Sequence, residues 1–157
     1  MQLRTTMLIT ILIASSLLNQ RLTLAAESAP IPASWKQAAV AADHPLASEA
    51  GVEMLRQGGN VVDAAVAVGF ALSVLRPGSS GMGGGGFMVI WDAKNQRAIA
   101  LDYRERAPLA ATRNMYAQGG SEASQRGALA VAVPGHVRGL CHALKKYGTL
   151  PLSTVLQ

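Results

Sequence analysis

A short polar run in the middle of the chain holds the side chains best suited to binding an anionic ligand, Asp102-Tyr103-Arg104-Glu105-Arg106. It continues an apolar run that is predicted to be a β-strand. Because side chains alternate along a strand, Arg104 shares a face with Asp102 and Arg106, and Glu105 points to the other face. An arginine there offers a rigid fork of donors that matches a carboxylate. Spacing alone leaves two interpretations open: a carboxylate site built on Arg104, and a solvated strand end with a local ion pair.

Upstream of that run, six glycines occur within nine residues, at positions 78, 81 and 83–86. Glycine loses more conformational freedom on folding than any other residue, so this run indicates backbone conformations that side chains forbid, or a close approach to the main chain. Gly81, Gly83 and Gly86 formally match G-x-G-x-x-G, but a dinucleotide site requires the order strand, glycines, helix, and the order here is helix, glycines, strand. No Lys-Ser or Lys-Thr follows, so a P-loop is excluded as well. We predict a site nearby or a crowded junction.

No other motif supplies a nucleophile or a metal site. The sequence contains neither G-x-S-x-G nor H-E-x-x-H. His44, His136 and His142 lack ligand spacing, and we interpret each as a surface or structural residue. The lone cysteine, Cys141, is interpreted as a small apolar residue of the core.

The formal net charge of +5 does not indicate a nucleic-acid partner. The basic residues are scattered singly or in pairs, and no basic stripe alternates with aromatic residues.

The first residues are typical of an export signal. Arg4 precedes an uncharged, mostly apolar stretch at 7–18, and small residues follow at 24–26. The stretch is shorter than the roughly 20 apolar residues that span a bilayer. We therefore expect a signal peptide at 1–26, a linker at 27–37, a secreted or periplasmic protein and no stable membrane span after signal removal. An uncleaved membrane anchor is the alternative.

The rest of the chain, residues 38–157, predicts helices that alternate with strands. Pro45 begins a helix that Gly58 and Gly59 end. Asn60 caps a second helix, at 61–75, which is apolar on almost every face and is expected to be buried on all sides.

Two strands, 87–91 and 98–103, predict a β-hairpin covered on both faces. A further strand is expected at 128–133 and an amphipathic helix at 136–147, with Val137, Leu140, Cys141 and Leu144 on its buried face. These elements predict a layered α/β fold. Pro151 opens a last helix with an uncovered apolar face, which suggests that the chain is part of a longer domain.

Five blocks carry a likeness to a known family, and they are, in order, GGNVVDAAVA at 58–67, the glycine run with Phe87 at 81–87, YRERAP at 103–108, AVAVPG at 130–135 and KYGTLPL at 146–152. In order and spacing these blocks resemble the start of a γ-glutamyltranspeptidase. The resemblance covers residues 38–157.

The resemblance implies the αββα sandwich of an N-terminal-nucleophile hydrolase, of which this chain holds the N-terminal portion, in the large subunit. Such a precursor cleaves itself, and the new N-terminal threonine of the small subunit attacks the γ-glutamyl amide of glutathione. The acyl group then passes to water, an amino acid or a peptide, and no metal or organic cofactor is expected. The threonine belongs to the small subunit, which is the expected partner, so no catalytic residue is assigned to this chain.

By the same resemblance, the arginine that binds the α-carboxylate of the γ-glutamyl group falls on Arg104, and the glycine run becomes a buried structural turn near the substrate pocket. The implied function is part of an exported γ-glutamyltransferase or glutathione hydrolase, with glutathione and other γ-glutamyl compounds as substrates. The 157-residue chain alone is expected to be inactive. Two alternatives stay open: a secreted, non-catalytic binding module for an acidic ligand, and a fragment of a related self-processing acylase of the cephalosporin acylase type.

Overall fold

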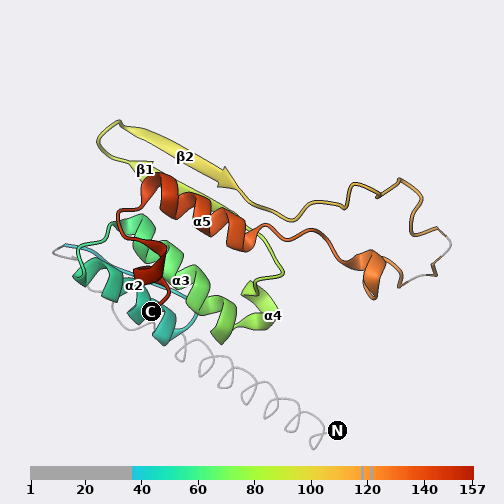
Figure 1. The fold of residues 1–157 in the computed structure, drawn as a ribbon, viewed down its shortest axis with the longest axis horizontal. Helices are drawn as coiled ribbons and strands as arrows, with labels where there is room; N and C mark the ends of the chain where they lie inside the picture. The colour runs from blue at the N-terminus through green and yellow to red at the C-terminus, as the bar shows by residue number, and fades with distance from the viewer. Residues whose placement is uncertain (1–36, 118, 121) are drawn as a thin grey trace, which may run out of the picture. The chain divides into compact units, whose positions relative to one another are not determined.

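The computed structural model describes residues 37–157, apart from 118 and 121. The predicted signal peptide, and all but the last residue of the predicted linker, lie outside the described residues and stay predictions. Residues 38–157 form one compact unit. Its elements follow the order α2, α3, α4, β1, β2, the 3-10 helix η1, α5 and α6 (Figure 1).

Helix α2 spans Pro45–Arg56, as the sequence predicts. The His44 side chain caps it by accepting a hydrogen bond from the backbone N–H of Leu46, at 3.2 Å. The helix ends before Gly58, whose φ of 85° suits glycine and few other residues.

Helix α3 spans Val61–Leu75 and begins with the predicted cap. The Asn60 side chain accepts hydrogen bonds from the backbone N–H groups of Val62 and Asp63, and Asp63 Oδ2 accepts one in return from Asn60 N, at 2.6 Å. The prediction that α3 is buried on all sides is wrong for the described part of the chain, where Val61 and Val74 are exposed. The helix buries one stripe, which includes Val66, and leaves its other face open.

A buried carboxylate ties the start of α3 to the chain after α5. Asp63 accepts hydrogen bonds from Thr149 N at 2.9 Å, from Thr149 Oγ1 at 2.7 Å and from Leu150 N at 3.0 Å. Asn60 Nδ2 donates to the carbonyl of Tyr147 at 2.8 Å. We call Asn60, Asp63 and residues 147–150 the Asp63 latch.

The predicted hairpin is present, with β1 at Phe87–Asp92 paired antiparallel to β2 at Arg97–Asp102. Met88, Ile90 and Leu101 face the core, whereas Phe87, Val89 and Trp91 are exposed. The expectation that both faces of the sheet are covered is therefore wrong for the described residues. The alternating burial of β1 shows one covered face and one open face.

Helix α5, at His136–Tyr147, packs against both α3 and β2 and lies between them in Figure 1. The predicted helix is confirmed, but its buried stripe is shifted by one residue, to His136, Gly139, Leu140, Ala143 and Leu144. Val137 is exposed and Cys141 is half-buried, so their predicted core positions are wrong. Layers of helices cover one face of a small antiparallel sheet, which confirms the α/β class.

The strand predicted at 128–133 does not form. The chain makes a 3-10 helix there, η1 at Ala128–Ala130, after Gly127 with a φ of 83°. Val133 alone pairs with a neighbouring segment, in a bridge to Arg106. Gly127 redirects the chain before the apolar run, and Pro134 lacks the N–H that a ladder would need.

Two short helices complete the fold, α4 at Pro77–Ser80 and α6 at Leu152–Val155. The sequence predicted the start of α6 but not α4. None of the helices in the part of the chain that the structure describes is long and apolar enough to cross a membrane.

Candidate functional site

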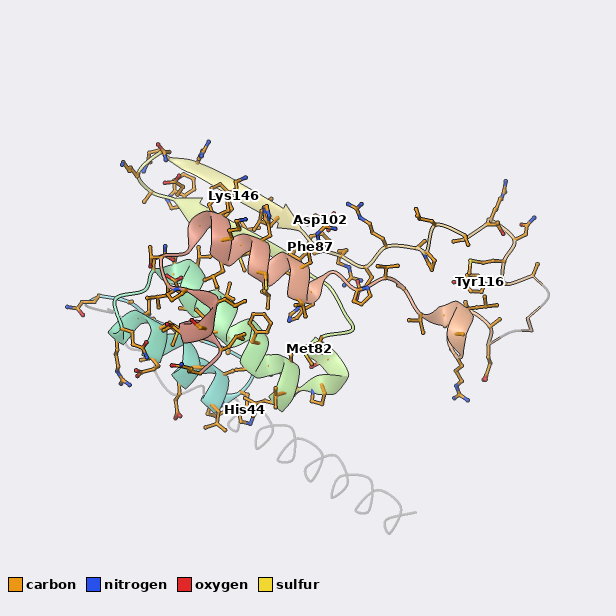
Figure 2. All side chains as sticks on the ribbon, viewed as in Figure 1. His44, Met82, Phe87, Asp102, Tyr116 and Lys146 are labelled. Atoms are coloured by element: carbon orange, nitrogen blue, oxygen red, sulfur yellow. The ribbon has the colours of Figure 1, made fainter. Side chains whose placement is uncertain are left out.

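Arg104 lies two residues beyond the end of β2 and continues the strand's alternation. Asp102, Arg104 and Arg106 are exposed, while Tyr103 and Glu105 are half-buried. The shared face predicted for the first three residues is therefore present. Asp102 pairs with Phe87 across the hairpin, and Figure 2 shows both at the end of the hairpin from which the chain continues to Arg104.

Three segments cross immediately beside Arg104. The carbonyl of Gly84 accepts hydrogen bonds from the N–H groups of Gly135 and His136, each at 3.0 Å. Gly86 and Tyr103 exchange two backbone hydrogen bonds, at 3.3 and 3.0 Å. We call this meeting of residues 84–86, 103–105 and 135–136 the crossing.

The glycines at the crossing are needed because main chain lies against main chain. A β-carbon on Gly85 would lie 2.8 Å from Glu105 N, and one on Gly135 would meet the carbonyl of Tyr103. By contrast, a β-carbon on Gly83 would have no atom within 4 Å. No glycine at 78–86 has a positive φ, so close approach, and not unusual backbone conformation, explains residues 84–86.

The crowded junction predicted from the glycine run is thus confirmed. The expectation of a buried turn needs correction, because Met82 and Gly83 are exposed and residues 84–86 are only half-buried in the described part of the chain.

A pocket of about 390 Å³ opens beside the crossing, between the end of β2, the Arg106 region and α5. Its polar lining includes Arg104, Arg106, Arg138, His142 and Asp102. Asp102 supplies the one carboxylate among these lining side chains, and its Oδ1 accepts a hydrogen bond from Arg104 N at 2.9 Å. The charge of the lining therefore suits an anionic ligand.

The Arg104 guanidinium contacts two neighbouring side chains, and these contacts use only some of its hydrogen-bond donors. Its Nη1 lies 3.1 Å from Glu105 Oε2, and the Arg104 side chain remains 53% exposed. The guanidinium carbon lies 6.0 Å from the centre of the Phe87 ring, within range of a cation–π contact. Two partners thus orient the fork, while other donors stay available to a ligand.

The Arg104–Glu105 contact is an ion pair without a well-aligned hydrogen bond. Glu105 Oε2 is buried and has no hydrogen-bond partner among the residues that the structure describes. The local ion pair that the sequence offered as an alternative therefore exists, and it coexists with the pocket.

The histidines occupy the surface and structural places that the sequence suggested. His44 caps α2, His142 lies on the exposed pocket lining and His136 is buried, with 8% of its surface exposed. Sequence reasoning missed the pairing of His136 with Ser73, on α3, at 3.0 Å. Their 63-residue separation leaves no local signal, although a serine on an otherwise apolar helix is a hint. Among the described residues, no group of three or more histidine, cysteine or acidic side chains is placed to hold a metal ion.

Comparison with known proteins places this architecture in one family. The sequence model of the gamma-glutamyltranspeptidase family matches residues 47–157. The glutathione hydrolase proenzyme of Escherichia coli is 48% identical over 130 residues, a match that covers 80% of this chain and 22% of that protein. The chain therefore spans about a fifth of the length of that relative.

Two solved structures show the same fold over the matched part. The Helicobacter pylori gamma-glutamyltranspeptidase superposes with a TM-score of 0.75 at 50% identity, covering 81% of this chain and 37% of that chain. A cephalosporin acylase from Bacillus halodurans gives a TM-score of 0.67 at 33% identity, covering 82% and 25%. The chain belongs to the gamma-glutamyltranspeptidase family, as the sequence motifs indicated.

Proposed function

We propose that this chain is the N-terminal part of the large subunit of an exported γ-glutamyltransferase or glutathione hydrolase, in which Arg104 binds the α-carboxylate of the γ-glutamyl donor. The observation that carries the proposal is the half-exposed Arg104 guanidinium at the rim of a pocket lined by three arginines. A carboxylate in that pocket would meet a planar fork of donors that is already oriented. Membership of the family supplies the class of donor.

The reaction requires a nucleophile that this chain is not proposed to contain. In the proposed mechanism, the N-terminal threonine of the small subunit attacks the γ-carbonyl carbon, and its hydroxyl proton passes to the free α-amine of the same residue. The bond to the leaving amine breaks as that amine takes up the proton. Water or an acceptor amine then attacks the ester carbonyl and gives a proton to the threonine α-amine, and the ester C–O bond breaks as the threonine oxygen takes that proton back. The word proenzyme in the names of relatives supports a partner made from the same precursor.

A chimera tests the proposal. Residues 47–157 of this chain replace the matching region of the E. coli glutathione hydrolase proenzyme, and we call the product the chimera. We expect it to cleave itself and to release aniline from γ-glutamyl anilide. Failure to turn over any γ-glutamyl compound, in a folded and processed chimera, would contradict the proposal.

The likeness to a cephalosporin acylase keeps that alternative in view. Glutaryl anilide separates the two, because it keeps the carboxylate and lacks only the α-amine of a γ-glutamyl group. Both anilides offer a carboxylate to Arg104, so the α-amine decides, and a γ-glutamyltransferase with α-amine-binding residues in its small subunit should prefer the γ-glutamyl anilide. A preference for the glutaryl compound would favour the acylase.

The other alternative, a secreted module that binds an acidic ligand without catalysis, is tested at the level of the gene. We expect the DNA beyond the codon for Gln157 to continue in frame into a segment led by a threonine. A stop codon there, together with a secreted product of this length, would favour the binding module.

A further inference from the structure

Two buried, titratable side chains in the described part of the chain take no part in the proposed reaction, Asp63 of the latch and His136. His136, the first residue of α5, is 8% exposed, and its hydrogen-bond partner Ser73 on α3 is 7% exposed. A serine beside a histidine could suggest a nucleophile and its base, so the direction of each hydrogen bond decides what the pair can do.

The hydrogen bonds favour a structural role for Ser73 over a nucleophilic one. Its hydroxyl donates to the carbonyl of Gly69 at 2.9 Å, which uses its one proton. His136 Nε2 lies 3.0 Å from Ser73 Oγ and 3.4 Å from the same Gly69 carbonyl, which can only accept, and both neighbours therefore favour the tautomer in which Nε2 carries the hydrogen and donates it. A ring nitrogen that donates to the serine cannot remove a proton from it. The pair is therefore a fixed buried hydrogen-bonded link from α3 to α5.

The link continues to the segment after β2 that carries Arg104. The rings of His136 and Tyr103 meet edge to face, with their centres 6.2 Å apart and an interplanar angle of 62°. On its other sides, Tyr103 fits against positions without side chains. A β-carbon on Gly139 would overlap its ring, and one on Gly86 would come within 3.0 Å of it. The hydroxyl of Tyr103 donates to the carbonyl of Phe87 at 3.3 Å.

We infer that Ser73 and His136 are positioning residues for Arg104, and that they act through Tyr103. Tyr103 and Arg104 are consecutive, so the ring that packs inward fixes the direction in which the next side chain leaves the main chain. If the Tyr103 side chain shifts in its site and the main chain at residues 103–104 moves with it, the guanidinium moves relative to the pocket. This inference rests on the proposed function for its kinetic consequence, but its structural step does not.

The structural step is tested in the full 157-residue chain by NMR, with the Arg104 Nε–H signal as the readout. We expect Ser73→Ala to move this signal toward that of an unfolded arginine, because His136 loses its nearer acceptor, at 3.0 Å, and keeps only the longer contact to the carbonyl of Gly69, at 3.4 Å, so the Tyr103 ring loses a fixed neighbour. Ser79→Ala is the matched control, since Ser79 is exposed. An Arg104 signal that is the same in wild type and Ser73→Ala would overturn the inference, whatever the enzyme assays give.

The kinetic step is tested in the chimera by a double-mutant cycle. A neutral hydrogen bond of this kind corresponds to about a fivefold effect, so we expect Ser73→Ala to raise KM for γ-glutamyl anilide about fivefold with little change in kcat. In an Arg104→Ala background the same substitution should have almost no further effect on KM. An equal effect in both backgrounds would show a general structural role and would overturn the inference.

A variant with His136→Gln gives a second route that keeps a donor near Ser73, and we expect it to retain more of the wild-type KM than His136→Ala. Equal KM values in these two variants would contradict a role for the hydrogen bond. If neither variant folds, the Ser73→Ala arms still decide. If Arg104→Ala alone leaves KM unchanged, the proposed function fails, and the NMR result on the positioning step still stands.

Discussion

The Asp63 latch and the crossing beside Arg104 each contain a charged side chain from a motif that the sequence singles out, but they use the charge in opposite ways. Asp63 has no exposed surface, and both of its oxygens accept hydrogen bonds from Asn60, Thr149 and Leu150. Arg104 is half-exposed and is bound through a single ion pair. The hydrogen-bonding capacity of Asp63 is used within the fold, whereas Arg104 keeps donors that can bind a ligand.

The comparison teaches how to separate residues that hold the fold from residues that bind a ligand. Both motifs look equally specific in the sequence, and they differ in the burial and the hydrogen-bond partners of the charged side chain. A buried charge whose every lone pair is used stabilises the fold, and its loss leaves donors without partners. Removing a charged side chain that lies at a pocket rim and has unused donors should lower the free energy of unfolding less, and weaken ligand binding more.

The largest expected effect follows from removing the Asp63 carboxylate from the Asp63 latch. Asp63→Ala leaves four donor groups without an acceptor, and we expect a loss of about 3–5 kcal/mol in the free energy of unfolding. Asp43→Ala, which removes an exposed ion pair to Arg76, is the control and should cost no more than about 1 kcal/mol. Urea unfolding of the full chain measures both. Equal losses of unfolding free energy in the two variants would contradict the claim that the buried Asp63 carboxylate stabilises the fold more than an exposed ion pair does.

The glycine run offers the next test, within a few residues. Gly85→Ala forces a methyl group against main chain at the crossing, and we expect it to destabilise the chain by about 1–3 kcal/mol. Gly83→Ala enters open space at an ordinary φ, so we expect it to be neutral or to stabilise by up to about 1 kcal/mol. Thermal unfolding compares the two variants. If Gly83→Ala were the more harmful, close approach would not be the reason for the run.

The smallest effect is the pH dependence of the latch. Burial raises the pKa of Asp63, but the hydrogen bonds from Thr149, Leu150 and Asn60 outweigh it and hold the pKa below its usual value. The stabilisation is therefore present above roughly pH 4, the ordinary aspartate pKa, and is lost as pH falls through the lowered value. We expect the unfolding free energy of Asp63→Asn to change less than that of wild type as the pH falls from about 5 through the lowered pKa of Asp63. Identical slopes would contradict this assignment.

Local signals made much of the fold predictable. Pro45, the Asn60 cap and Gly148 mark helix ends whose chemistry lies within a few residues of each boundary. The hairpin followed from two apolar runs around a polar turn. The strand predicted at 128–133 was wrong because the prediction relied on local β-branched residues. The positive φ of Gly127 instead directs the chain into the 3-10 helix η1.

The site was predictable only in part. Alternation along β2 placed Arg104 on the face of Asp102 and Arg106, and the glycine run predicted crowding. The pocket could not be predicted, because Arg138 reaches it from a helix that follows a long connection. The link from Ser73 to His136 joins residues 63 apart, and pairing at that range is a property of packing, not of local pattern.

The central claim, that Arg104 binds the α-carboxylate of the donor, is tested most directly by removing each partner in turn. In the chimera, KM is measured for γ-glutamyl anilide and for 4-aminobutanoyl anilide, which lacks only the α-carboxylate. Because charge-assisted hydrogen bonds contribute about 1.5–3 kcal/mol each, Arg104→Ala should raise KM for γ-glutamyl anilide about ten- to hundredfold. It should leave KM for 4-aminobutanoyl anilide unchanged. An equal change for both donors, or no change for either, would contradict the account.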